Sequence, residues 1–186
     1  EGRRVRRSDG ARRATRPLVV RPVEVRLAAE PRARAGSRLS VQLDGAGNAD
    51  DLIAIVAADA PDGTIGNHVR RGAGDRLEIL VPPDPGRYEL RYLLDQRRHR
   101  VSSQPLDVEA PTLTLQAPDR VPAGGSVQVQ VHGRANAGDL VCIVPKGAPH
   151  DSIGAHVRTT DAEAQTVVVP RLAREPGHYE IRYVID

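Results

Sequence analysis

The chain has 186 residues, a net charge of +3 and 39% hydrophobic residues, and it contains 17 Gly and 15 Pro. This length suits one large domain or two small ones, and the many turn-forming residues favour a β protein over a helical one. A single cysteine excludes an intrachain disulfide, and no apolar run reaches the roughly 18 residues that a membrane-spanning helix needs.

The positive charge is concentrated at the N-terminus, where residues 1–16 hold seven of the 27 basic residues but only two of the 24 acidic ones. This segment has no apolar periodicity, and we predict that residues 1–20 form a disordered Arg-rich tail or linker. The tail can make weak contacts with anionic lipid or nucleic acid, or it can be a solvated linker from a preceding domain. Because the chain has neither a methionine nor an apolar leader, we interpret it as a processed chain or an excerpt of a longer one.

From residue 23 onward, apolar and polar residues alternate as is typical of half-buried strands. We predict strands at 23–27 and 39–43, with a turn at 31–36 between them. The run 52–56 is apolar throughout, which predicts a central strand covered on both faces. About seven short strands result, the number and spacing of an immunoglobulin-like (Ig-like) β-sandwich. The remaining predicted strands lie at 65–70, 77–81, 86–94 and 101–108.

The same pattern occurs twice in the chain. Residues 136–144 match residues 48–56 at an offset of 88, and residues 176–183 match residues 85–92 at an offset of 91. The extra residues of the second copy fall in a loop, as expected for repeated structural units. The prediction is an all-β chain of two tandem Ig-like β-sandwiches, at 21–109 and 110–186.

The repeat also indicates how the second copy begins and ends. Only Ala110 and Pro111 are expected between the two copies, a linker short and stiff enough to limit the relative motion of the domains. Asp186 aligns with Asp95, after which the first copy continues into a further strand, so the second copy is predicted to lack its last strand. Either the chain is incomplete at its C-terminus, or a partner or neighbouring copy supplies that strand at an open sheet edge.

All four tyrosines lie in the repeated segment Pro-Gly-x-Tyr-Glu-(Leu/Ile)-Arg-Tyr, and the chain has no Phe or Trp. Residues i and i+4 of a strand share a face, so Tyr88 and Tyr92 are expected to face one core, and Tyr179 and Tyr183 the other. The first tyrosine of each pair is placed like the tyrosine corner of sandwich domains. We interpret the four rings as structural anchors; the alternative is that they bind a ligand.

An aspartate precedes each central strand, Asp51 in the first copy and Asp139 in the second. Neighbouring carboxylates such as Asp50 suggest a Ca²⁺ loop, but Gly138 replaces Asp50 in the second copy. We therefore interpret Asp51 and Asp139 as structural anchors that bond backbone amides in their turns, and we predict no metal site and no cofactor. The chain has no nucleophile-elbow or phosphate-loop motif, so no catalytic residue is assigned. The thiol of Cys142 is expected to be buried in the central strand.

Three motifs, present in both copies, resemble a known module. They are (Gly/Asp)-Asp-Leu-(Ile/Val)-x-Ile-Val, Ala-Pro-x-(Gly/Asp)-(Thr/Ser)-Ile-Gly and the tyrosine segment. Together they resemble a small Ig-like module of bacterial envelope proteins that is often attached to a von Willebrand factor type A domain, and more distantly the SKICH domain. Leu52 and Leu140 depart from that pattern, which usually has an aromatic residue there. The resemblance implies a non-catalytic accessory or adhesion-type domain with no catalytic residues to transfer.

The resulting hypothesis is a non-catalytic structural or protein-interaction module of a larger bacterial cell-envelope protein, located outside the cytoplasm. Its partners would be another protein or other domains of the same polypeptide, contacted through strand faces and the loops 45–51 and 134–139. One alternative is a carbohydrate-binding module, which the lack of Trp and Phe disfavours. The other is an accessory or regulatory domain of an enzyme, with the Arg-rich tail as an anionic docking arm.

Overall fold

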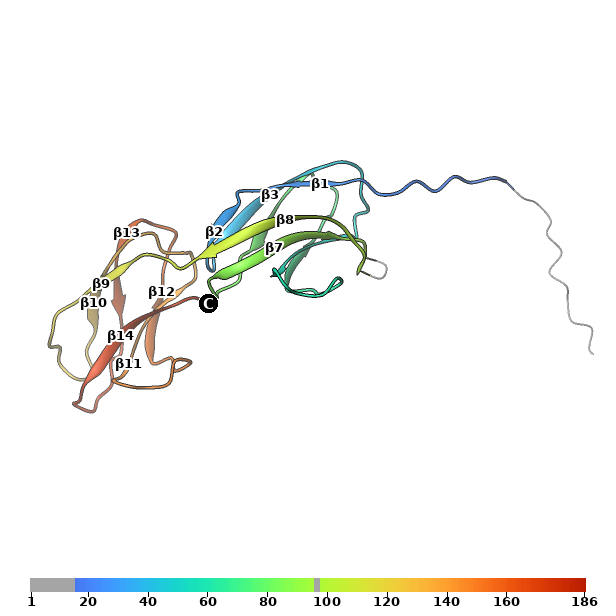
Figure 1. The fold of residues 1–186 in the computed structure, drawn as a ribbon. Coiled ribbons are helices and arrows are strands. Elements are labelled where there is room, and N and C mark those ends of the chain that lie inside the picture. Colours follow the sequence, from blue (N-terminus) through green and yellow to red (C-terminus); the bar gives the residue numbers. More distant parts are fainter. Residues whose placement is uncertain (1–15, 96–97) are drawn as a thin grey trace, which may run out of the picture.

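The structure is a computed structural model that describes residues 16–95 and 98–186. Its elements are all β-strands, and no described residue lies in an α-helix. Most of the predicted Arg-rich tail, residues 1–15, lies outside the described residues. Residues 16–25 belong to no strand and lead into the first of two end-to-end groups of strands, here called the first and second units (Figure 1).

The first unit is a β-sandwich of two sheets. All its strand pairs are antiparallel except β2 and β8, which run parallel. One sheet has the order β1-β3-β6 and the other β2-β8-β7-β4-β5. The bounds are β1 Arg26–Ala28, β2 Arg32–Arg34, β3 Arg38–Asp44, β4 Leu52–Ala57, β5 Asn67–Arg70, β6 Arg76–Leu80, β7 Gly86–Leu93 and β8 Arg100–Glu109.

The second unit repeats this sandwich with fewer strands. Its sheets have the orders β9-β10-β13 and β12-β11-β14, which correspond to β1-β3-β6 and β5-β4-β7. Among the described strands, β14 pairs only with β11, whereas its counterpart β7 lies between β4 and β8. The prediction of two Ig-like sandwiches, the second without its last strand, is therefore confirmed. The bounds are β9 Thr114–Gln116, β10 Val127–His132, β11 Leu140–Pro145, β12 Ala155–Arg158, β13 Ala164–Val169 and β14 Tyr179–Val184.

The turn predicted at 31–36 is present only at Ala35 and Gly36, and the first unit has eight strands instead of about seven. Arg32–Arg34 forms β2, whose backbone pairs with Asp107–Glu109 of β8. An exposed edge of β8 supplies the hydrogen-bonding groups for this pairing, and such tertiary pairing overrides the weak local preference of the sequence. The strand predicted at 65–70 begins only at Asn67, and Gly66 before it lies directly against the carbonyl of Ile55.

Each unit has its own hydrophobic core between its two sheets. The alternation of β3 and β10 places every second side chain there, and full burial of such an aliphatic side chain contributes roughly 1.5–3 kcal/mol. The core of the first unit is the larger. It contains Val25, Ala35, Leu39, Val41, Leu43, Ile53, Ile55, Ile79, Val81, Leu90, Tyr92, Leu106 and Val108, and the core of the second unit contains Val127, Val129, Val131, Ala135, Val141, Val167, Val169 and Leu172.

The outer face of β4 is also buried, as the apolar run 52–56 predicted. A smaller cluster of Leu52, Ala54, Val56 and Leu93 is covered by the loop that follows β4, through Ala60 and Ile65. An arginine binds this loop to the sheet. From the sequence, this arginine was predicted only to lie on the strand face opposite the tyrosines.

That arginine is Arg91 of β7, which is 1% exposed. Its guanidinium donates hydrogen bonds to the carbonyls of Ala60 at 2.8 Å and Pro61 at 2.9 Å, and to Glu89 at 2.8 Å. Arg182 of the second unit binds Ala148, Pro149 and Glu180 in the same way. The arginine of the repeated motif is thus a clamp between a strand and a loop.

Candidate interaction surface at the loop ends of the units

At one end of the first unit, the carboxylate of Asp51 lies at the centre of a buried hydrogen-bond network. Asp51 is 1% exposed and directly precedes β4. The hydroxyl of Tyr92 donates to its Oδ2 atom at 2.8 Å, and so does the backbone amide of Asn48 at 2.8 Å. The backbone amide of Asp95 donates to Oδ1 at 3.2 Å. This network ties the loop before β4 to the end of β7.

Burial and hydrogen bonding shift the pKa of Asp51 in opposite directions, but they shift the pKa of Tyr92 in the same direction. Burial alone would raise the pKa of Asp51, but the hydrogen bonds from Asn48, Tyr92 and Asp95 outweigh it and hold the pKa below its ordinary value. For Tyr92, burial and the hydrogen bond to Asp51 both raise the pKa of the hydroxyl. The pair is therefore an ionised carboxylate that accepts from a neutral phenol.

The second unit contains the same network around Asp139. The hydroxyl of Tyr183 donates to Oδ2 of Asp139 at 2.6 Å, and the backbone amide of Asp186 donates to Oδ1 at 3.2 Å. The oxygen of Tyr183 also accepts the backbone amide of Asn136 at 3.0 Å. Burial, together with the hydrogen bond to Asp139, raises the pKa of Tyr183 to about 12.

The other two tyrosines lie nearer the surface. The hydroxyl of Tyr88 donates to the carbonyl of Asp84 at 2.9 Å, and that of Tyr179 donates to the carbonyl of Glu175 at 3.0 Å. These bonds to the backbone four residues upstream are those of a tyrosine corner. Tyr88 is half-buried, whereas Tyr179 is 36% exposed.

The two units are joined by the side chain of Asn136, which is buried against the first unit. Its Oδ1 atom accepts two hydrogen bonds from the guanidinium of Arg34, from Nε at 2.9 Å and from Nη2 at 2.7 Å. Its Nδ2 atom donates to the carbonyl of Ala35 at 3.0 Å and to Asp139 at 2.9 Å. One amide side chain thus binds both the first unit and the carboxylate network of the second.

Apolar packing completes this junction. Ile185, just after β14, packs against the core of the first unit. It lies so close to Gly36 that a Cβ atom at that position would overlap its Cγ2 atom. Gly36 also has a φ of +71°, a backbone conformation that side-chain-bearing residues rarely adopt. The turn Arg34-Ala35-Gly36 is therefore the part of the first unit that the second unit holds.

The first unit has an equivalent of the loop surface with which the second unit forms the junction. This equivalent surface lies at the end of the first unit away from the junction, and it is open. Asn48, Asp50, Asp51, Leu94 and Asp95 line a hollow of about 320 Å³ there. Asn48, Asp50 and Asp95 are exposed, and Leu94 is half-buried. The loop 45–51 therefore has a free surface, whereas the loop 134–139 is partly covered by the junction.

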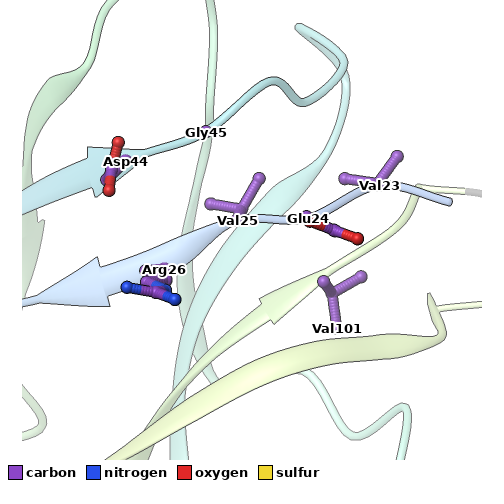
Figure 2. A pocket seen from close by; sticks show the side chains of 7 residues that line it. All are labelled: Val23, Glu24, Val25, Arg26, Asp44, Gly45 and Val101. Carbon is purple, nitrogen blue, oxygen red and sulfur yellow. The ribbon is translucent and has the colours of Figure 1, made fainter.

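A larger hollow of about 600 Å³ lies beside β1. Figure 2 shows its lining, in which Val23 and Val25 alternate with Glu24 and Arg26 along one segment. Asp44 and Val101 come from other strands, and the charged side chains do not converge on one point. Arg26 and Asp44 are partners across the β1–β3 pair. The lining residues are Val23, Glu24, Val25, Arg26, Asp44, Gly45 and Val101.

Within residues 16–95 and 98–186, no three His, Cys, Asp or Glu side chains are arranged to hold a metal ion. No helix in this part of the chain is long and apolar enough to cross a membrane. Cys142 is fully buried in β11, and burial raises the pKa of its thiol. A raised thiol pKa disfavours the reactive thiolate.

Two features of the structure were not predicted from the sequence, the junction through Asn136 and the clamp of Arg91. The clamp had a signal, since an arginine recurs at the same place in both copies opposite Ala54 or Cys142. The junction had none, because Asn136 and Asn48 occur in equivalent loops and only one of them contacts another unit.

No family model and no curated protein matches the chain. Among solved structures, a mutant alpha-2-macroglobulin from Salmonella is 15% identical, with 87% of this chain and 14% of that chain covered and a TM-score of 0.33. Elastase-activated alpha-2-macroglobulin from Escherichia coli is 12% identical, with 88% and 20% covered and a TM-score of 0.35. The human OSCAR ligand-binding domain is 14% identical, with 87% and 88% covered and a TM-score of 0.31. The Ig-like assignment rests on the strand order of the two sandwiches.

Proposed function

We propose that the chain is a non-catalytic tandem module that spaces and binds proteins as part of a larger bacterial cell-envelope protein, outside the cytoplasm. Its domains would be residues 21–109 and 110–186. The envelope location follows from the resemblance of the three repeated motifs to modules associated with von Willebrand factor type A domains. The charged groups around the hollow beside β1 do not converge as those of an active site do.

The observation that carries the proposal is the direct junction between the units. A linker alone permits hinge motion, but here Asn136 bonds to Arg34 and Ala35 while Ile185 packs on the core of the first unit. Such a junction fixes the distance and orientation of the two free ends, which is what a spacer requires. It also leaves the loop 45–51 as the exposed surface for a partner.

A carbohydrate-binding role is less well supported. Sugar sites need exposed aromatic platforms, and of the four tyrosines only Tyr179 is exposed. Its hydroxyl is already bonded to the backbone of its own turn.

The spacer function can be tested with spin labels attached to the variants Glu78→Cys and Lys146→Cys in a Cys142→Ala background. These two positions are exposed and lie in different units. Alanine is the residue that the first copy has in place of Cys142. We expect a narrow distance distribution that broadens in Asn136→Ala, and no broadening in the matched control Asn48→Ala. A broad distribution in the parent protein would contradict a rigid spacer.

The binding function can be tested by cross-linking to envelope proteins. Asp50→Lys, in the exposed loop, should reduce cross-linking without changing the melting temperature. Glu163→Lys, a charge reversal at an exposed loop of the second unit, is the matched control. Equal cross-linking by all three proteins would exclude the loop 45–51 as the partner surface.

A further inference from the structure

The free end of the first unit carries equivalents of the two side chains with which the second unit binds the first. Asn48 corresponds to Asn136 and Leu94 to Ile185 in the two aligned copies. In the second unit this asparagine and this aliphatic residue provide the polar and the apolar half of the junction. The first unit presents the same pair beside the open hollow of about 320 Å³.

The carboxylate that positions the asparagine is also the same. Asp139 accepts a hydrogen bond from Nδ2 of Asn136 at 2.9 Å, and Asp51 accepts one from Nδ2 of Asn48 at 3.2 Å. A buried carboxylate of this kind turns the amide oxygen of the asparagine outward. In the second unit that oxygen receives Arg34, but in the first unit Oδ1 of Asn48 accepts no hydrogen bond from any described residue.

In both units, the segment that leads into the first strand runs close to a glycine at the asparagine-bearing end of the unit. A Cβ atom on Gly45 would overlap the carbonyl of Glu24, and one on Gly133 would overlap the carbonyl of Thr112. In Figure 1 the N-terminal segment leaves the first unit at the end away from the second. At the second unit, the chain that passes Gly133 comes from β8, whose neighbour β2 ends at the docked arginine.

The charge at the free end suits a guanidinium. Asp50 and Asp95 are exposed there, and Gly138 replaces Asp50 at the junction. Arg70 lies 3.3 Å from Asp50 and 3.7 Å from Asp95 and offsets part of this charge. The guanidinium of Arg71 is bonded to Gly45, Gly72 and Asp75. Among the described ion pairs, Arg70 alone offsets the carboxylates of Asp50 and Asp95.

We propose that Asn48, Leu94 and Asp95 form an acceptor site for an arginine-bearing turn at the end of a β-sandwich in a partner protein. The turn would be a counterpart of Arg34-Ala35-Gly36, with its guanidinium on Oδ1 of Asn48 and its small residues against Leu94. A second copy of this chain does not fit, because its own Arg34 is already bound to Asn136. The inference rests on the proposed role of the chain in binding proteins.

The experiment uses the isotope-labelled full chain and a cyclised peptide with the sequence of residues 29–38, which contains the turn. Titration should shift the side-chain amide of Asn48 and the methyl groups of Leu94 in a saturable way. A peptide with Ala in place of the arginine at position 34 should bind about tenfold more weakly, because a charge-assisted hydrogen bond is lost. Signals of Asn136 should not move, since the attached turn has a far higher effective concentration there.

Variants of the full chain separate specific docking from general charge attraction. Asn48→Ala should weaken peptide binding about tenfold, and its melting curve shows whether the unit remains folded. Asp50→Asn, at an exposed position without core contacts, should weaken binding by a smaller factor. Shifts that persist unchanged in Asn48→Ala, or no saturable shift at Asn48 and Leu94, would overturn the proposal.

Evidence that either of two other occupants fills the site would also overturn the proposal. Concentration-dependent self-association that Asn48→Ala abolishes would assign the site to a second copy. A shift of the Asn48 amide on deletion of residues 1–15 would assign it to the N-terminal segment of the same chain. The spin-label distances across the junction do not depend on any of these results, so the spacer proposal can stand or fail separately.

Discussion

The buried pair of Asp51 and Tyr92 links two segments that are 41 residues apart in the chain. Asp51 accepts from four donor groups. Such a carboxylate is stable when buried, but each lost donor leaves lone pairs without a partner. We propose on this basis that Asp51 and Asp139, with Tyr92 and Tyr183, act as structural anchors.

Substitution of Tyr92 by Phe tests this role. Tyr92→Phe keeps the ring but removes the donor to Asp51, so the free energy of unfolding should fall by roughly 1–3 kcal/mol. Urea denaturation measures the change. Tyr88→Phe is the matched control, because its hydroxyl bonds to an exposed carbonyl and its loss should cost less. An equal effect of the two substitutions would exclude a special role for the buried pair.

The second pair predicts a dependence of stability on alkaline pH. The pKa of Tyr183 rises from 10.0 to about 12 on folding. The unfolded chain therefore releases this proton first, and stability that is complete below pH 10 falls as the pH rises toward 12. Tyr183→Phe should flatten this fall in denaturation curves recorded across the range, whereas Tyr179→Phe should leave it unchanged. The same slope in both variants would contradict the assignment.

At the scale of the strands, the clamp of Arg91 determines whether the outer face of β4 stays covered. Its guanidinium bonds to two loop carbonyls and to Glu89 from a buried position. Removal of one partner of such a buried pair is strongly destabilising.

We expect Arg91→Ala to destabilise the first unit by roughly 3 kcal/mol or more. Amide hydrogen exchange in the loop 58–66 should become faster, because its carbonyls lose their donor. Arg87→Ala, on the same strand but exposed, should leave both properties unchanged. Unaltered exchange in the loop of Arg91→Ala would contradict the clamp.

The strands could be predicted from the sequence where alternation was clear and could not where pairing was nonlocal. Leu39, Val41 and Leu43 alternate with polar residues, and they form the core face of β3. Arg32–Arg34 has no such pattern and is a strand only because β8 offers its edge. Likewise, Arg91 was placed on the correct face, but its burial depends on a loop that the sequence alone does not position.

The same limit applies to the candidate surface. The matched spacing of the two copies pointed to Asp51 and Asp139, because a carboxylate before a central strand is a local feature. The role of Asn136 depends on Arg34, 102 residues away, and Asn48 in the equivalent loop makes no such contact. Only the three-dimensional arrangement distinguishes the two asparagines.

At the scale of the whole molecule, the contact of Gly36 with Ile185 fixes how the units meet. Gly36→Ala introduces a Cβ atom that overlaps Ile185, and it also strains a backbone with a φ of +71°. Spin-label distances across the junction should broaden, and stability should decrease.

A second substitution separates these two effects. In an Ile185→Ala background the overlap with Cγ2 is absent. Gly36→Ala should then cost only the backbone strain and the close approach to Nδ2 of Asn136 at 3.1 Å, and the two substitutions should be non-additive. Additive effects on the free energy of unfolding would show that the junction contact contributes nothing.

The parallel pairing of β2 with β8 has a mechanical consequence. The chain enters the first unit before β2 and leaves it after β8, so tension on the chain pulls these neighbours in opposite directions along their length. Their backbone bonds, continued by Asp107 to Pro31 and Ala35 to Glu109, are then loaded in shear and must break together. The second unit has no such pair among its described strands. In single-molecule stretching, the first unit should therefore need the higher force to unfold.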